Sequence, residues 1–198
     1  MGPAIILASG STIRKEVLRS AGVNFEVISK PIDEAAIKTA MLEQNARLRD
    51  IADALAEAKA MRVSRNTSGL VIGADQIMVM DDELFDKPPT IEAARERLLA
   101  MRGKMHKLIG ALVICEGGEP VWRHVSTVRL YVREFSDDWL EDYIKAEGEL
   151  LTKSVGAYRF EGLGAQLFEK VDGDMFSIMG LSLLPLLDYL RTRGAIAS

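Results

Sequence analysis

The chain has 198 residues, of which 48% are hydrophobic and 27% charged, with a formal net charge of −4. This composition is typical of a folded globular protein and excludes disordered and fibrous classes. The negative net charge gives no general attraction for nucleic acid, so an anionic ligand would need a local group of cations. The apolar run before Ser9 is too short for a signal peptide or a membrane span, and the single cysteine, Cys115, allows no internal disulfide. The sequence therefore predicts a cytoplasmic protein whose partner is neither a membrane nor a nucleic acid polymer.

The first half of the chain predicts alternating strands and helices. A buried strand is expected over residues 4–9, followed by a small polar turn and a helix that Gly22 closes. NFEVIS, residues 24–29, predicts a second strand, and PIDEAAIK, residues 31–38, a loop. From Leu42 to Val63, Ala, Leu and Met recur at helical spacing, which predicts one long amphipathic helix.

The second half continues the alternation. VIGADQIMVM predicts a strand to Gly73 and a second segment from Ile77 that turns back at Asp81-Asp82. The later elements are a helix over residues 91–103, two strands over 106–132 joined at Gly-Gly, a helix from Ser136 to Gly148, a loop and strand over 156–174 and a helix over 183–193. Interleaved strands and helices predict an α/β fold.

Asp75 interrupts one of these apolar runs. An ionised Asp inside a buried strand costs several kcal/mol unless it is paired or binds a metal. Asp75 is therefore a candidate functional residue. The alternative is that the strand ends at Ala74 and that Asp75 caps the following turn.

The segment ASGSTIRK, residues 8–15, predicts a phosphate-binding turn. Free backbone N–H groups at a helix start, small side chains and the cations Arg14 and Lys15 suit a phosphate group. The alternative is an ordinary Ser or Thr cap followed by a solvated basic face. Neither a GxGxxG nor a Walker A sequence is present, and two histidines do not support a zinc site.

What remains is a set of carboxylates and cations that suits hydrolysis of a phosphoanhydride. Magnesium-type ions take one or two carboxylates plus phosphate oxygens, while Lys and Arg neutralise charge on the transferred and leaving groups. Taken singly, Lys59 is equally consistent with a solvated helix face and Glu34 with a helix-start acid. The set comprises Glu34, Asp75 and Asp86 with Arg14, Lys15, Lys59 and Lys87.

These segments together resemble the Maf family of nucleoside triphosphate pyrophosphatases. The resemblance is carried by LASGSTIRKEVL with VNFEVISKPIDE, ALAEAKA, VIGADQIMVMDDELFDKP, RGKMH, and GAYRFEGLGAQLFEKVDGD followed by MGLSLLPL. It implies one elongated α/β domain over residues 1–198, with two lobes around a mixed sheet and a nucleotide-binding cleft, often as a homodimer. It also implies that a divalent cation (Mg²⁺, Mn²⁺ or Co²⁺) and water cut a nucleoside triphosphate to monophosphate and pyrophosphate.

The resemblance also assigns residues. It makes Asp75 the catalytic proton acceptor and, together with Glu34, a metal ligand. It places the catalytic lysines at Lys59 and Lys87. It assigns phosphate binding to Ser9, Arg14 and Lys15.

Gln76 and Glu161 resemble the branch of this family that acts on 7-methyl-GTP rather than on dTTP or UTP. A carboxylate suits guanine because the N1–H and the exocyclic amine form adjacent donors, and a ring made cationic by methylation gains further from Glu161. Trp122 would stack on the base if it reaches the pocket. The other departures from the family pattern are Thr12 for Pro, Asp86 for Gly, Lys104 for Arg and Gly110 for Thr.

Two other functions fit parts of the pattern. One is a regulator of cell division that binds a nucleotide without turnover. The other is a phosphatase acting on monophosphates. The combination of Glu34, Asp75, Lys59 and Lys87 favours the pyrophosphatase, because binding alone needs no carboxylate to activate water.

Overall fold

The computed structural model describes residues 2–197 as an α/β protein with a seven-stranded sheet, which confirms the predicted fold class. The strands are β1 (Ile5–Leu7), β2 (Glu26–Val27), β3 (Leu70–Met80), β4 (Glu83–Phe85), β5 (Met105–Glu116), β6 (Glu119–Val132) and β7 (Phe168–Asp172). The α-helices are α1 (Thr12–Ser20), α2 (Glu34–Glu43), α3 (Leu48–Ser64), α4 (Ile91–Met101), α5 (Asp137–Glu147), α6 (Met175–Ile178) and α7 (Leu183–Thr192). Two 3-10 helices complete the chain, η1 (Gly148–Lys153) and η2 (Leu163–Leu167).

The sheet is mixed, with strand order β2-β1-β3-β5-β6-β7 and β4 paired to β3. β1 runs parallel to both β2 and β3, whereas β4 returns antiparallel to β3 and β7 lies antiparallel to β6. Asp81 and Asp82 both have positive φ, as the tight turn between β3 and β4 requires. The predicted reversal at Asp81-Asp82 is thus confirmed.

The chain divides into two compact units. The first comprises Met1–Gln76, Ile109–Ser126 and Met175–Ser198, and the second comprises Ile77–Leu108 and Thr127–Asp174. The boundary therefore falls inside β3, directly after Gln76.

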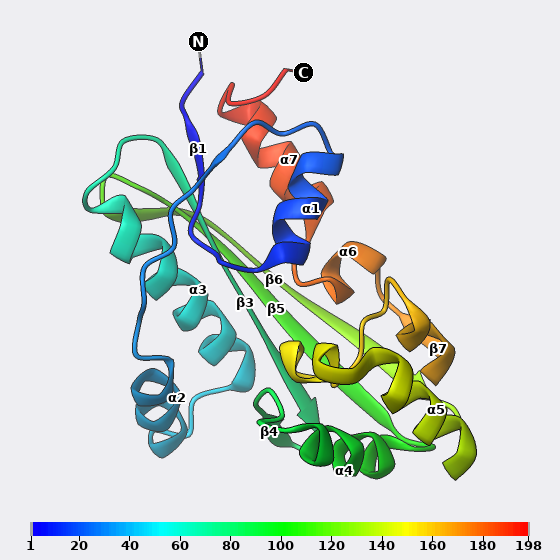
Figure 1. Ribbon diagram of the computed structural model, residues 1–198. Helices are drawn as coiled ribbons and strands as arrows, with labels where there is room; N and C mark the ends of the chain where they lie inside the picture. Colours follow the sequence, from blue (N-terminus) through cyan, green and yellow to red (C-terminus); the bar gives the residue numbers. More distant parts are fainter. Residues whose placement is uncertain (1, 198) are drawn as a thin grey trace. The chain divides into compact units, whose positions relative to one another are not determined.

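Side chains of β3 alternate between two differently packed faces of the first unit. Leu70, Ile72 and Ala74 join a hydrophobic cluster to which β1, α1 and α7 also contribute. The intervening positions face α3, because a Cβ at Gly73 would meet Ala56 O at 2.0 Å. Figure 1 shows α1 and α7 on one side of β3 and α3 on the other. The residue after Ala74 therefore points toward α3.

The second unit has its own core beneath helices α4 and α5. Its buried side chains include Leu98 of α4, Leu140 of α5 and Leu130 of β6. His106 is 1% exposed and shares a hydrogen bond of 2.8 Å with the hydroxyl of Tyr158. Burial lowers the pKa of His106 to about 4.

Three predicted elements differ from the structure. β3 is continuous through Asp75, so the expected break there is wrong, as is the alternative in which Asp75 caps a turn. The expected loop over residues 31–38 instead contains the start of α2, which Asp33 caps by accepting a hydrogen bond from Ala36 N at 2.9 Å.

The third difference is that the single helix expected over 42–63 is the end of α2 followed by α3. Asn45 adopts a left-handed φ of 53°. Asn45 N donates to Leu42 O and Ala46 N to Met41 O, which is the Schellman pattern of a helix end. The remaining predicted strands and helices are present, although β2 is shorter than expected.

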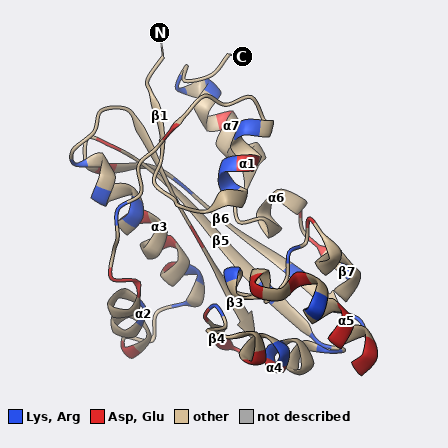
Figure 2. Cartoon of the chain, in the orientation of Figure 1, with Lys and Arg blue, Asp and Glu red and all other residues tan. Residues whose placement is uncertain are grey.

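Both kinds of charge lie along the same helices. Figure 2 shows Lys or Arg together with Asp or Glu on α3, α4 and α5.

Within residues 2–197, none of the helices has the length and apolar character that crossing a bilayer requires.

Candidate active site

Asp75 is a nearly buried carboxylate in the centre of the sheet. It is 7% exposed and lies on the longest run of buried residues in β3. Because strand side chains alternate, it follows Gly73 on the face that α3 covers. Gly73 has no side chain, so α3 approaches β3 closely there, with Ala60 N 2.8 Å from where a Cβ would lie. This close approach brings the neighbouring residue of α3, Lys59, to Asp75.

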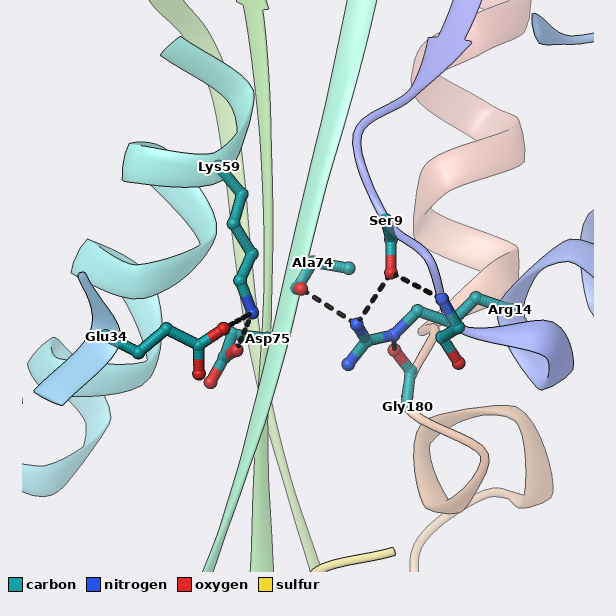
Figure 3. A network of polar contacts seen from close by, with 8 residues as sticks. Ser9, Arg14, Glu34, Lys59, Ala74, Asp75 and Gly180 are labelled. Atoms are coloured by element: carbon teal, nitrogen blue, oxygen red, sulfur yellow. Dashed lines mark hydrogen bonds and ion pairs between the residues drawn. The ribbon is translucent and has the colours of Figure 1, made fainter. Parts of the chain in front are cut away.

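The ammonium group of Lys59 bridges two carboxylates. Nζ lies 2.6 Å from Asp75 Oδ1 and 2.8 Å from Glu34 Oε1. The Lys59 side chain is 18% exposed and that of Asp75 is 9% exposed, whereas that of Glu34 is 43% exposed. Figure 3 shows both carboxylates turned toward the same nitrogen. The pair of Lys59 and Asp75 is thus enclosed, and Glu34 forms its open side.

A divalent cation would fit the two carboxylates. Among the described residues 2–197, His, Cys, Asp and Glu form no group of three or more placed to hold a metal ion. A magnesium-type ion needs only one or two carboxylates when a substrate's phosphate oxygens complete its coordination. Glu34 and Asp75 provide that number of carboxylates, and they converge because both contact Lys59.

Arg14 lies on the other side of β3 from Lys59, and its guanidinium donates hydrogen bonds to three oxygens of the protein. Nε donates to Gly180 O at 2.8 Å, and Nη1 donates to Ala74 O at 2.9 Å and to Ser9 Oγ at 3.1 Å. Burial of the guanidinium lowers the pKa of Arg14, and the charges of Asp75 and Glu34 oppose that shift. Arg14 therefore joins the Ser9 turn, the residue before Asp75 and the Gly180 loop (Figure 3).

The turn before α1 lacks a side-chain cap. Ser11 stands at the N-cap of α1 but makes no side-chain capping bond. Ser11 N instead approaches Ser9 Oγ at 3.3 Å. The alternative of an ordinary hydroxyl cap is therefore not what the structure shows. Lys15 is half-buried on the first turns of α1.

Gln76 points to the face of β3 opposite Asp75. Its Nε2 donates to Ser177 O at 2.8 Å and to Ile178 O at 3.3 Å. Two residues after α6 lies Gly180, whose carbonyl accepts from Arg14 and whose φ of +82° suits glycine. Gln76 and Arg14 therefore hold the end of α6 and the residues that follow it.

Sequence reasoning assigned no role to this segment. MGLSLLPL was noted only for its resemblance, yet Gly180 in it accepts a hydrogen bond from a predicted site residue. Ser177, Ser182 and Ser126 form a chain of hydroxyls with two O···O distances of 2.9 Å. In the sequence, the signal for this segment is Gly180, because glycine readily adopts the positive φ that the structure shows there.

Four predicted residues lie outside this group. Three of them, Asp86, Lys87 and Glu161, belong to the second unit and are exposed. Trp122 stacks on Tyr189 with ring centroids 5.2 Å apart and packs against the hydrophobic cluster of the first unit. The ring of Trp122 is therefore engaged within the protein, and we assign it no contact with a base.

The chain is similar to a family model and to several curated proteins over nearly its whole length. The model of the family described as Maf-like protein matches residues 4–193. A nucleoside triphosphate pyrophosphatase from Caulobacter vibrioides is 50% identical over 192 residues, which cover 97% of this chain and 96% of that protein. One from Hyphomonas neptunium is 47% identical over 193 residues, or 98% of each chain. A 7-methyl-GTP pyrophosphatase from Brucella abortus is 45% identical over 193 residues, or 97% of each chain.

The contacts of Arg14 predict a large effect on stability. Arg14→Lys keeps the charge but cannot reach all three acceptors, so the free energy of unfolding should fall by about 3 kcal/mol. The same substitution at Arg19, an exposed residue of the same helix, should change it by less than about 0.5 kcal/mol. Urea unfolding of the two variants measures both values. Equal stability of Arg14→Lys and wild type would contradict the anchoring role.

Proposed function

The chain belongs to the Maf-like protein family, and we propose that it hydrolyses nucleoside triphosphates to nucleoside monophosphates and pyrophosphate with the help of a divalent cation. The observation that carries the proposal is the enclosed pair of Asp75 and Lys59. A buried carboxylate held by one lysine is costly for folding and is of use where a proton must be accepted. We further propose that the enzyme is cytoplasmic and favours a 7-methylguanine base.

Asp75 acts as the proton acceptor in this proposal. Its Oδ1 contacts Lys59. In the proposal, the carboxylate orients a water molecule and takes its proton. Lys59 fixes the direction of the carboxylate and supplies positive charge near the reacting phosphate. Carboxylate, lysine and water then act together without rearrangement of the strand.

Glu34 and Asp75 would hold the divalent cation, which we propose to be Mg²⁺, Mn²⁺ or Co²⁺. When bound, such an ion neutralises charge on the phosphate oxygens. The exposed side of Glu34 leaves room for it, because that side chain is 43% exposed. The protein contributes the convergence of the two carboxylates.

The remaining cations bind phosphate in the proposal. Ser9 and the backbone before α1, together with Lys15 and Lys87, contact the triphosphate. Arg14 adds charge from within the protein while its Nε and Nη1 hold the surrounding segments. Glu161 accepts hydrogen bonds from the guanine edge in this proposal. Gln76 is also proposed to bind substrate, with its amide held by the carbonyls of Ser177 and Ile178 at the end of α6.

Amidation of Asp75 provides the direct test of its role. Asp75→Asn should lower turnover by about 10²-fold or more, because the positioned base is lost. Asp53→Asn is the matched control, since Asp53 also pairs with a cation in the first unit, 2.5 Å from Arg123. Pyrophosphate and orthophosphate are measured separately. Full activity of Asp75→Asn would contradict the proposal, and nucleotide binding without turnover in the wild type would favour the regulator instead.

Base selection is tested with a panel of triphosphates. We expect the specificity constant for 7-methyl-GTP to exceed those for dTTP and UTP, because a carboxylate accepts from the guanine donors and meets carbonyls on the pyrimidines. Glu161→Gln should reduce the ratio of the specificity constant for 7-methyl-GTP to those for dTTP and UTP. Glu169→Gln, an exposed Glu of the same unit, should not. Cleavage of dTTP or UTP at least as efficient as that of 7-methyl-GTP would refute the preference.

A further inference from the structure

Glu161 stands in the segment Ser154–Gly164 of the second unit, which runs from the end of η1 into η2 and whose residues are hydrogen-bonded to one another. Ser154 Oγ donates to Tyr158 O at 2.7 Å and accepts from Tyr158 N at 3.0 Å. Gly162 N donates to Arg159 O at 3.2 Å. A Cβ at Gly164 would lie 2.5 Å from Arg159 O, so only glycine permits this close turn. The backbone on both sides of Glu161 is therefore fixed.

Two side chains tie this segment to the rest of the unit. The hydroxyl of Tyr158 lies 2.8 Å from His106 Nε2, and its ring packs edge-on against Phe168. Arg159 forms a bidentate pair with Glu147, with Nε–Oε2 at 2.8 Å and Nη2–Oε1 at 3.1 Å. These two anchors lie three and two residues before Glu161 in the sequence.

The pair of Glu147 and Arg159 joins a buried carboxylate to a partly exposed guanidinium. The side chain of Glu147, the last residue of α5, is 2% exposed, whereas that of Arg159 is 38% exposed. A buried ion pair contributes little net stability compared with apolar side chains of the same size. Such a pair is better explained by the geometry that it imposes, since a fork on a carboxylate fixes both direction and distance.

Arg159 also feels the charge of Glu161. Its pKa is raised, first by the hydrogen bond to Glu147 and to a smaller extent by the charge of Glu161. Glu147 occupies Nε and Nη2 of Arg159, so these two donors are engaged. Glu161 itself is exposed.

We propose that Glu147 is a positioning residue for base selection, which holds Arg159 so that the segment Ser154–Gly164 presents the Glu161 carboxylate to the base. The inference rests on the proposed function, in which Glu161 recognises the base. Without the Glu147 carboxylate, the freed guanidinium would turn to Glu161 two residues along the chain and neutralise the group that discriminates. Selection among bases would then weaken, while binding of the phosphates would not.

The test compares Glu147→Gln with Glu141→Gln. Glu141 is a suitable control because it lies on the same helix and pairs with Arg95 at 2.7 Å on the surface, away from that segment. For each variant, the specificity constants are measured for 7-methyl-GTP, GTP, dTTP and UTP. Inhibition by inorganic tripolyphosphate reports phosphate binding alone.

We expect Glu147→Gln to reduce the ratio of specificity constants between the preferred and the poorest base by about tenfold or more, chiefly through KM. Inhibition by tripolyphosphate should stay at the wild-type value, and amide hydrogen exchange should quicken over residues 159–164. Glu141→Gln should match wild type in all three readouts. If Glu147→Gln folds poorly, Glu147→Asp serves, because it keeps the charge, shortens the reach and should lower the ratio partially.

Two results would overturn the inference. One is an unchanged ratio in Glu147→Gln, whichever base the wild type prefers. The other is an equal loss on every triphosphate with weaker tripolyphosphate inhibition, which indicates a general structural role. If the wild type binds these nucleotides but does not hydrolyse them, the proposed function fails. The ratio is then taken from dissociation constants, and a reduced ratio still supports the inference.

Discussion

The ion pair between Asp75 and Lys59 is the constraint around which the first unit is arranged. A carboxylate that is 7% exposed in the middle of a sheet requires a cation at contact distance. Lys59 meets that need only because α3 lies unusually close to β3, where Gly73 faces Ala56 and Ala60. Gly73, Ala56 and Ala60 thus allow the close packing of α3 on β3, and that packing places the Lys59 ammonium at Asp75.

The opposite face of the strand is held just as firmly. Arg14 binds the carbonyl of Ala74 and that of Gly180, and Gln76 binds carbonyls at the end of α6, just before Gly180. The residues before and after Asp75 are therefore both fixed by hydrogen bonds. A base positioned in this way needs no reorganisation when it acts, which is the general advantage of a preorganised site.

The sequence predicted much of this arrangement because its signals are local. Periodicity gave most strands and helices, and the position of Asp75 in an apolar run marked it as a functional candidate. The division between α2 and α3 was missed because it depends on Asn45 adopting a left-handed conformation, where glycine is the usual signal. Asp33, an ordinary N-cap residue directly before Glu34, is the local signal in the sequence for the start of α2.

The partners of Arg14 could not be predicted for a different reason. They include backbone carbonyls 60 and 166 residues away, and a carbonyl carries no mark of its role in the sequence. The same holds for the carbonyls that bind Gln76. The sequence marked Lys59 and Glu34 as candidate site residues. That the carboxylates of Glu34 and Asp75 both contact the Lys59 ammonium follows only from the packing of α3 on β3 and from the start of α2.

The most direct measurement of the central claim is a double-mutant cycle on turnover with Asp75→Asn, Lys59→Gln and the double variant. If the two side chains act as one unit, either single change removes most of the function. The account predicts that the double variant is about as active as the slower single variant, with all three retaining the wild-type fold. Losses that multiply, so that the double variant is slower by the product of the single effects, would contradict it.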